Sequence, residues 1–388
     1  MTRETVLANA RVVLPDAVVT GAVVIRDGAI VEILEGKVGH GEDLGGDYLL
    51  PGLVELHTDH LELHVTPRPG TGWDHVPAVL AHDLQLNGAG VTTVFDAIRL
   101  GQAGDDDVLP AGRLLAEAIT HAGEAGITRA DHFIHLRCEV AAPTAVEEFE
   151  ALQDVDAVRL ASLMDHTPGQ RQYADVESFR RYMVGKGRVS NEGFDALMLR
   201  RREMSAKYSD ANRRGIAERA AARGITLAAH DDATVEHVDE AAALGVRICE
   251  FPTTEIAAKA AHERNQLIVM GAPNVVRGGS QSGNVAATGL LERGLLDVLS
   301  SDYVPASPLQ AIFQLAADGA LPLEQGVGLV SSNPARAVGL DDRGEITVGR
   351  RADLARVQTH QLPSTEPRPK GQCVPVVRAV YRQGVRVS

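Results

Sequence analysis

The segment Leu49 to Gly70, LLPGLVELHTDHLELHVTPRPG, joins an apolar run directly to a cluster of imidazole and carboxylate groups. The apolar part, which Pro51 and Gly52 punctuate, is typical of a buried strand. Side chains alternate between the two faces of a strand, so His57 and Asp59 are expected to project together from its end. An imidazole beside a carboxylate is half of a metal site, although a polar loop after a strand could carry the same residues without a metal.

The chain has 388 residues, 44% of them hydrophobic and 23% charged, which suits one large soluble domain with a smaller one. Its net charge of −14 argues against general binding to nucleic acid or to an anionic membrane. The three cysteines, Cys138, Cys249 and Cys373, form no CxxC motif, as is typical of a reducing compartment. We find no signal-peptide pattern and no membrane-spanning apolar run, so we expect a cytoplasmic protein. The sequence leaves open whether it forms a homo-oligomer.

Between residues 49 and 340, apolar strands alternate with polar loops and helices. One helix is predicted to have Ser307 as its N-cap, Pro308 in its first helical position and Gly319 beyond its end. The predicted strands are Leu49–Leu56, Val91–Asp96, Phe133–Glu139, Val158–Met164, Thr226–His230, Val246–Phe251, Leu267–Met270 and Leu296–Ser300. Eight strands alternating with helices predict an α/β protein with a (β/α)8 TIM barrel.

Both ends of the chain carry strand patterns without intervening helices. Chain termini often lie close together, so residues 1–48 and 341–388 are expected to form one small β-sandwich domain beside a barrel at 49–340.

Acidic and imidazole side chains follow several of the predicted barrel strands, where the active site of such a barrel lies. We predict six of them as metal ligands: His57, Asp59, Glu139, His166, His230 and Asp302. These are enough for two divalent ions bridged by a carboxylate, and Zn, Mn, Fe, Co and Ni are all compatible with such ligands. Asp96 and Glu250 also end strands, but a role as buried hydrogen-bond partners is an equally good interpretation.

Basic residues in or near the same loops indicate an anionic substrate, since arginine and exposed backbone N–H groups bind phosphate well. The predicted substrate-binding residues are Arg68, Arg99, Arg171, Lys186, Arg277 and Gln281, the last in a Gly/Ser/Gln loop at 278–284. Each arginine alone is more often a surface charge. Arg137 is left out because it shares a strand face with Glu139 and could pair with it.

The blocks PGLVELHTDH, SSDYVP, NPARAVGL and GEITVGRRADL resemble the amidohydrolase superfamily of metal-dependent barrels. Further blocks between residues 49 and 355 resemble its phosphonate-metabolism branch, which comprises the diphosphatases of the carbon–phosphorus lyase pathway. These blocks are HTDHLELHVTPRPGTGW, GVTTVFDA, FIHLRCEV, LMDHTPGQRQY, HDDAT, CEFPTTEIAAKAA, MGAPNVVRGGSQSGN and SDYVPAS. The superfamily usually has His-x-His on the first strand, whereas Asp59 holds the second position here. No lysine lies at a strand end between Asp96 and His230, so the bridging role that a carboxylated lysine often has in the superfamily is assigned to Glu139.

The resemblance implies a hydrolase of phosphoric anhydride bonds. Metal-bound hydroxide would attack the α-phosphorus of α-D-ribose 1-methylphosphonate 5-triphosphate, which releases pyrophosphate and leaves the 5-phosphate. Asp302 would orient this hydroxide and accept its proton, and the basic groups would offset the phosphate charge. Two alternatives stay open: an amidohydrolase acting on a cyclic amide or amine, by C–N hydrolysis or deamination, and a scaffold that has lost its chemistry.

Overall fold

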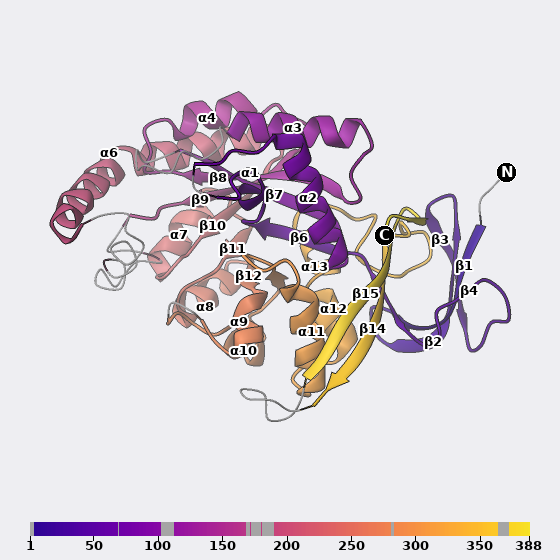
Figure 1. Ribbon diagram of the computed structural model, residues 1–388. Coiled ribbons are helices and arrows are strands. Elements are labelled where there is room, and N and C mark those ends of the chain that lie inside the picture. The colour runs from indigo at the N-terminus through magenta and orange to yellow at the C-terminus, as the bar shows by residue number, and fades with distance from the viewer. Residues whose placement is uncertain are drawn as a thin grey trace.

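A computed structural model describes residues 4–68, 70–101, 112–167, 171, 180, 190–280, 283–363 and 372–388. The strands in these ranges form two sheets of eight strands each. Figure 1 shows the barrel with its helices on one side and the sheet of the two chain ends on the other. Among the described residues, no helix combines the length and the apolar character that crossing a membrane requires.

The first sheet is an all-parallel barrel in which the strands follow one another in sequence order. Its strands are β6 (Leu53–Thr58), β7 (Val91–Leu100), β8 (Asp131–Glu139), β9 (Val158–Met164), β10 (Thr226–His230), β11 (Ile248–Glu250), β12 (Leu267–Gly271) and β13 (Val298–Ser300). Buried apolar side chains from the strands pack in a cluster that includes Leu56, Phe95, Leu160, Ile248 and Val298. The predicted eight-stranded barrel is therefore confirmed.

Helices cover the outer face of this barrel (Figure 1). They are α1 (Leu61–Val65), α2 (His75–Gly88), α3 (Gly112–Glu124), α4 (Ala145–Leu152), α6 (Asn191–Arg223), α7 (Val235–Ala243), α8 (Glu255–Glu263), α9 (Ala272–Arg277), α10 (Ala287–Glu292), α11 (Ser307–Ala317), α12 (Leu323–Gly328) and α13 (Ser332–Ala337). The predicted N-cap at Ser307 is wrong by one residue. Ala306 caps α11, and the Ser307 hydroxyl instead donates to the Val304 carbonyl at 2.7 Å, which stabilises the preceding turn.

The apolar run Leu49–Leu56 is not one strand, as predicted, but is divided between the two sheets. Its first part forms β5 (Tyr48–Pro51), which pairs with strands of the second sheet, and β6 begins only at Leu53. The break falls at Gly52, where an added Cβ would lie 2.8 Å from Thr92 Cβ, closer than two carbon atoms can approach. Pairing with strands that are distant in the sequence therefore decides where the first barrel strand begins, and the closeness of Thr92 requires glycine at the break.

The second sheet is mixed and joins both ends of the chain. Its remaining strands are β1 (Glu4–Val13), β2 (Val18–Arg26), β3 (Ala29–Glu35), β4 (Glu42–Asp43), β14 (Leu354–Leu362), β15 (Gln372–Arg382) and β16 (Val385–Arg386). Strand β5 lies between β1, to which it is parallel, and β14, to which it is antiparallel. Leu7, Ile25, Leu354 and Tyr381 are buried in one core there. The expected small β unit of both chain ends is present, while the domain bounds 1–48 with 341–388 and 49–340 stay a prediction.

The barrel closes where its first and last strands meet, at a contact that we call the seam and define by residues 55–59 and 300–302. The Asp302 N–H donates to the His57 carbonyl at 3.1 Å, and the Asp59 N–H donates to the Asp302 carbonyl at 3.0 Å. Below them, the buried Glu55 carboxyl lies 2.6 Å from the Ser300 hydroxyl. The seam therefore brings together residues from the two ends of the barrel sequence.

Candidate metal centre

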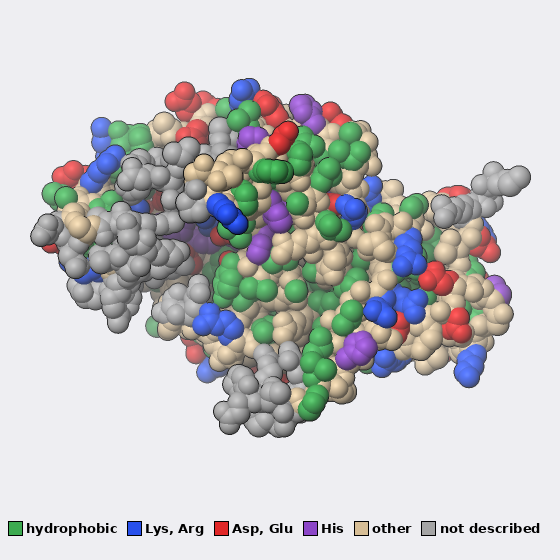
Figure 2. Space-filling model, viewed as in Figure 1, with side chains coloured by type: hydrophobic (Ala, Val, Ile, Leu, Met, Phe, Trp, Pro, Cys, Tyr) green, Lys and Arg blue, Asp and Glu red, His purple; other side chains and the backbone are tan. Residues whose placement is uncertain are grey.

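The six predicted ligands lie at one end of the barrel. Each occupies the carboxyl end of a strand or the loop directly after it: His57, Asp59, Glu139, His166, His230 and Asp302. Because the strands are parallel, these positions share one face of the sheet. Figure 2 shows histidine side chains on the viewed face of the barrel, with a basic side chain beside them.

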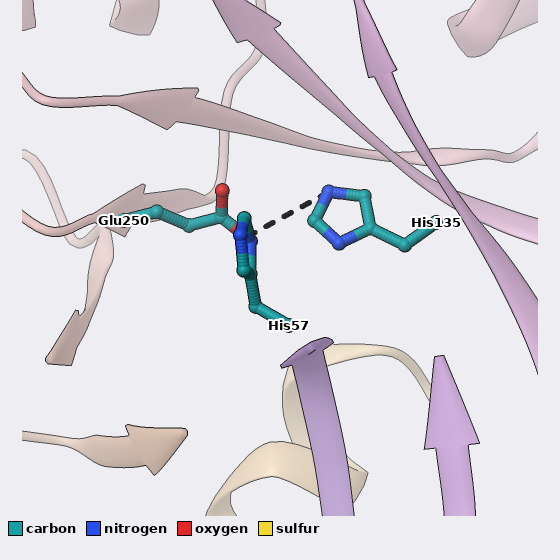
Figure 3. Close-up of side chains that lie close together, drawn as sticks. All are labelled: His57, His135 and Glu250. Atoms are coloured by element: carbon teal, nitrogen blue, oxygen red, sulfur yellow. Dashed lines mark ion pairs between the residues drawn. The ribbon is translucent and has the colours of Figure 1, made fainter. Parts of the chain in front are cut away.

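His57 and His230 are held by one buried carboxylate. Their rings stack with centroids 5.4 Å apart, and both Nδ1 atoms face Glu250, at 3.4 Å from Oε1 for His57 and 3.2 Å from Oε2 for His230. Figure 3 shows the Glu250 and His57 side chains converging with that of His135. Burial would raise the pKa of the Glu250 carboxyl, but the imidazoles of His135 and His57 hold it well below its usual range. The hydrogen bond between His230 Nδ1 and Glu250 fixes that ring and leaves its Nε2 for a metal, whereas His57 Nδ1 lies beside the carboxylate without a hydrogen bond among the described residues.

His166 has its own carboxylate partner. Its Nδ1 lies 2.6 Å from Glu139 Oε2, and its backbone N–H donates to Glu139 Oε1 at 3.1 Å. On the other side of the ring, Nε2 lies 4.0 Å from Asp231 Oδ2, an atom that is also 3.4 Å from His230 Nε2. In this arrangement Glu139 orients the His166 ring, and its predicted role as a bridge between two metals stays a prediction.

Asp59 lies between a histidine and an arginine. Its Oδ1 is 3.7 Å from His57 Nε2 and pairs with Nη1 of Arg137, whose side chain is buried. Arg137 therefore pairs with Asp59 rather than with Glu139, the partner that its strand face suggested. Burial would raise the pKa of the Asp59 carboxyl, but the Arg137 guanidinium and the His57 imidazole hold it below its usual value.

Asp302 follows β13 in a left-handed backbone conformation, with φ of +51°. Its carboxyl group approaches Gly271, where an added Cβ would lie 3.3 Å from Asp302 Oδ2. Burial raises the pKa of this carboxyl to about 6, partly offset by the nearby His57 imidazole. A carboxyl group that titrates near neutral pH is suited to accept a proton during a reaction.

Three of the predicted substrate-binding arginines lie at the surface. Arg99 is partly exposed, with Nε 3.3 Å from the Glu62 carboxylate. Arg277 ends α9, and its Nη1 lies 3.4 Å from the hydroxyl of Tyr303, the residue after Asp302. Arg68 is exposed beyond α1. Their roles in substrate binding stay predictions.

Arg171 has a different environment. Its guanidinium is buried, pairs with Asp232, and lies 3.7 Å from the Glu240 carboxylate. A phosphate could reach it only in exchange for these partners, so substrate binding by Arg171 stays a prediction. Lys186 and Gln281 lie outside the described residues.

Asp96 faces away from the barrel interior, toward α2. Its two carboxylate oxygens accept hydrogen bonds from His82 at 3.0 Å and from His132 at 2.7 Å. The interpretation of Asp96 as a buried hydrogen-bond partner is confirmed.

Two groups of side chains in the described part of the chain could each hold a metal ion: His57, His135 and Glu250, and His166, His230 and Asp231. His135 was missed because it lies inside β8 rather than at its end, although it shares a strand face with Arg137 and Glu139. Imidazole and carboxylate donors suit divalent transition metals. Asp231 Oδ2 is buried and has no hydrogen-bond partner in the described part of the chain, which leaves a donor atom for a cation. The residues present therefore fit a divalent metal.

Residues 84–388 match the sequence model of a protein family described as the amidohydrolase family. The α-D-ribose 1-methylphosphonate 5-triphosphate diphosphatase of Escherichia coli (strain K12) is 44% identical over 354 residues, which cover 90% of this chain and 94% of that protein. Among solved structures, the dihydropyrimidinase from Brevibacillus agri NCHU1002 is 15% identical with a TM-score of 0.63, covering 99% of this chain and 95% of that one. The N-acetyl-D-glucosamine-6-phosphate deacetylase from Mycobacterium smegmatis is 17% identical with a TM-score of 0.64, and the match covers 99% of this chain and 100% of that one. These structural likenesses concern the fold alone. The family resemblance of the sequence blocks is confirmed, and the chain belongs to the amidohydrolase family.

Proposed function

We propose that this protein is a metal-dependent hydrolase that cleaves α-D-ribose 1-methylphosphonate 5-triphosphate to the 5-phosphate and pyrophosphate in phosphonate catabolism. The observation that carries the proposal is the 44% identity to a diphosphatase of that substrate, over nearly the full length of both chains. Hydrolysis of a cyclic amide is the alternative. The dihydropyrimidinase that would favour it is only 15% identical, so it supports the shared fold and not a shared substrate.

We infer that two divalent ions, of Zn, Mn, Fe, Co or Ni, are bound by His57, Asp59, Glu139, His166, His230 and Asp302. When bound, such ions lower the pKa of the attacking water and offset the charge on the leaving oxygen. Asp302 would orient this water and accept its proton. Glu250 keeps the ring of His230 in place through its hydrogen bond to Nδ1 and offers a negative charge beside the ring of His57.

The phosphate groups of the substrate require cationic and N–H partners at the mouth of the barrel. We assign this role to Arg68, Arg99, Arg171, Lys186, Arg277 and Gln281. Arg277 has the best support, because its contact with the hydroxyl of Tyr303 brings an exposed guanidinium next to the chain segment of Asp302. Bidentate contacts from such a group would bind the triphosphate and hold its α-phosphorus for attack from one side.

We further infer that the protein works in the cytoplasm on a small-molecule triphosphate, with neither nucleic acid nor a membrane as a partner. The net charge of −14 supports this inference, because phosphodiester backbones and anionic lipids repel such a protein at long range.

A substrate panel tests the proposed function. The protein, loaded in turn with Zn²⁺, Mn²⁺ or Co²⁺, is incubated with the ribose 1-methylphosphonate 5-triphosphate, ribose 5-triphosphate, ATP and a hydantoin. We expect pyrophosphate release from the first compound with the highest kcat/KM. Release of orthophosphate alone, or turnover of the hydantoin alone, would overturn the proposal.

A further inference from the structure

We propose that Asp231 is a metal ligand, together with His166 and His230, and thus a seventh residue of the centre beyond the six assigned above; this inference rests on the proposed metal-dependent function. The Oδ2 atom of Asp231 lies 3.4 Å from His230 Nε2 and 4.0 Å from His166 Nε2. Two donor atoms that each lie about 2.1 Å from one tetrahedral ion are about 3.4 Å apart. The distance between Asp231 and His230 matches that spacing, and one donor atom from each of the three residues lies within 4.8 Å of the others.

The hydrogen positions on the two rings support a cation at this point. The Nδ1 atom of His166 lies against Glu139 and that of His230 against Glu250, so each Nδ1 carries a hydrogen and donates it. In a neutral ring, Nε2 then carries a lone pair, and both lone pairs face the Asp231 carboxylate. Lone pairs and a carboxylate oxygen repel one another unless a proton or a metal cation lies between them. A proton lies between two atoms only, whereas one divalent ion meets that requirement for all three at once.

The burial of Asp231 is independent evidence. Its side chain is 6% exposed, and Oδ2 has no hydrogen-bond partner among the described residues. Burying a carboxylate oxygen without a partner costs free energy, which a coordinated ion would offset.

The backbone explains why two consecutive residues reach the same point. Successive side chains of a strand alternate, so Asp231 should point away from His230. Asp231 instead has a φ of +59°, which is uncommon for a residue other than glycine, and its N–H donates to the Glu250 carbonyl at 2.9 Å. Such conformations cluster at functional sites, where the surrounding structure holds them in place. The left-handed residue ends the alternation and leaves the Asp231 carboxylate near His230 Nε2.

The variant Asp231→Asn tests the inference, because it keeps the size of the side chain and removes the charge. The readouts are the number of bound ions after dialysis, measured by inductively coupled plasma mass spectrometry, the Kd for Zn²⁺ by competition with a chelator, and the visible spectrum of the Co²⁺ form. We expect a more than tenfold rise in Kd and a changed Co²⁺ spectrum. Asp239→Asn is the matched control, since Asp239 is exposed on the following helix, α7, and pairs with Arg264; it should behave as wild type.

A second readout separates a ligand from a structural residue. In the metal-free state, Asp231→Asn should unfold at the same or a higher temperature than wild type, because the substitution removes a buried charge that lacks a partner. Wild-type metal affinity and Co²⁺ spectrum in the variant, or a wild-type protein that binds no metal, would overturn the inference. Failure of the wild-type protein to hydrolyse triphosphates while it binds metal would refute the proposed substrate and leave the ligand assignment intact.

Discussion

The Nδ1 atom of His166 lies 2.6 Å from Glu139 Oε2, on the side of the ring opposite to the nitrogen that faces Asp231. Glu139→Gln should therefore weaken metal binding by about 10- to 100-fold, since an amide no longer holds the ring and its hydrogen in place. Equilibrium dialysis with metal analysis measures this change, and the exposed Glu147 offers a control, Glu147→Gln. Loss of one of two bound ions, with the other bound normally, would instead favour the bridging role.

Asp302→Asn should lower kcat for pyrophosphate release by about 100-fold or more, because an amide cannot accept the proton of the attacking water. Asparagine tolerates positive φ, so the backbone at this position should be preserved. Circular dichroism checks the fold, and Asp318→Asn, at an exposed position after α11, serves as the control. Wild-type turnover in the Asp302 variant would remove this residue from the mechanism.

Arg277→Gln should raise KM for the triphosphate by about tenfold with little change in kcat, because a charge-assisted contact to phosphate contributes mainly to binding. Initial rates over a range of substrate concentrations separate the two constants. The control is Arg223→Gln. Arg223 is an exposed arginine at the end of α6 that pairs with Asp154, and its replacement should leave KM unchanged. If KM is unaffected in both variants, Arg277 is an ordinary surface charge.

His132 lies between two buried carboxylates, with Nδ1 2.7 Å from Asp96 and Nε2 3.2 Å from Asp83. Burial alone would lower the pKa of His132, but the two carboxylates raise it to about 10. The ordinary pKa of histidine is about 6.5, so the stabilisation by this charge is fully present below that pH and is lost as the pH rises toward 10. Urea denaturation of the wild-type protein should show a falling free energy of unfolding between pH 7 and pH 10.

His132→Asn should remove this pH dependence and lower the free energy of unfolding at pH 7 by about 3–5 kcal/mol, because it removes the cation of the buried Asp96 carboxylate, while Asp83 keeps its pair with Arg129. His121→Asn, at an exposed position on α3, should retain the wild-type profile. An equal decline between pH 7 and pH 10 in the His132 variant would assign the titration to other groups.

Gly52→Ala should lower the free energy of unfolding by about 1–3 kcal/mol, because the added methyl group meets the side chain of Thr92 in a packed region. Gly88→Ala provides a control of opposite sign. Gly88 ends α2, and outside the helix itself no atom of the described residues lies within 4 Å of the position of an added Cβ, so alanine should be neutral or stabilising there. Equal stability of both variants would mean that the Thr92 contact relaxes without cost.

The barrel could be predicted because its strands are short apolar segments, most of which are followed by polar residues, a pattern that is local in sequence. The division of the run Leu49–Leu56 could not, because it depends on the strands with which its two parts pair: β5 pairs with β1 and β14, and β6 pairs with β7. Position at a strand end was also enough to place His57, His230 and Asp302 on one face of the barrel.

Other features of the site depend on more than strand ends. His135 lies in the middle of β8 and reaches Glu250 only through the curvature of the closed sheet. Asp231 is adjacent to His230, and simple alternation places it on the wrong face until its positive φ is known. Arg137 and Glu139 share a strand face, but which acidic group pairs with the arginine depends on the neighbouring strand that carries Asp59.

The seam has a consequence for the biogenesis of the enzyme. The pair Glu55 and Ser300 is separated by 245 residues, and the contact of His57 with Asp302 spans the same stretch of chain. A nascent chain on the ribosome therefore holds no complete centre until its eighth barrel strand has emerged and docked against the first. Capture of the metal by the full set of ligands must be a late event in maturation, and a product truncated before β13 would lack Asp302 even if the rest of its barrel had assembled.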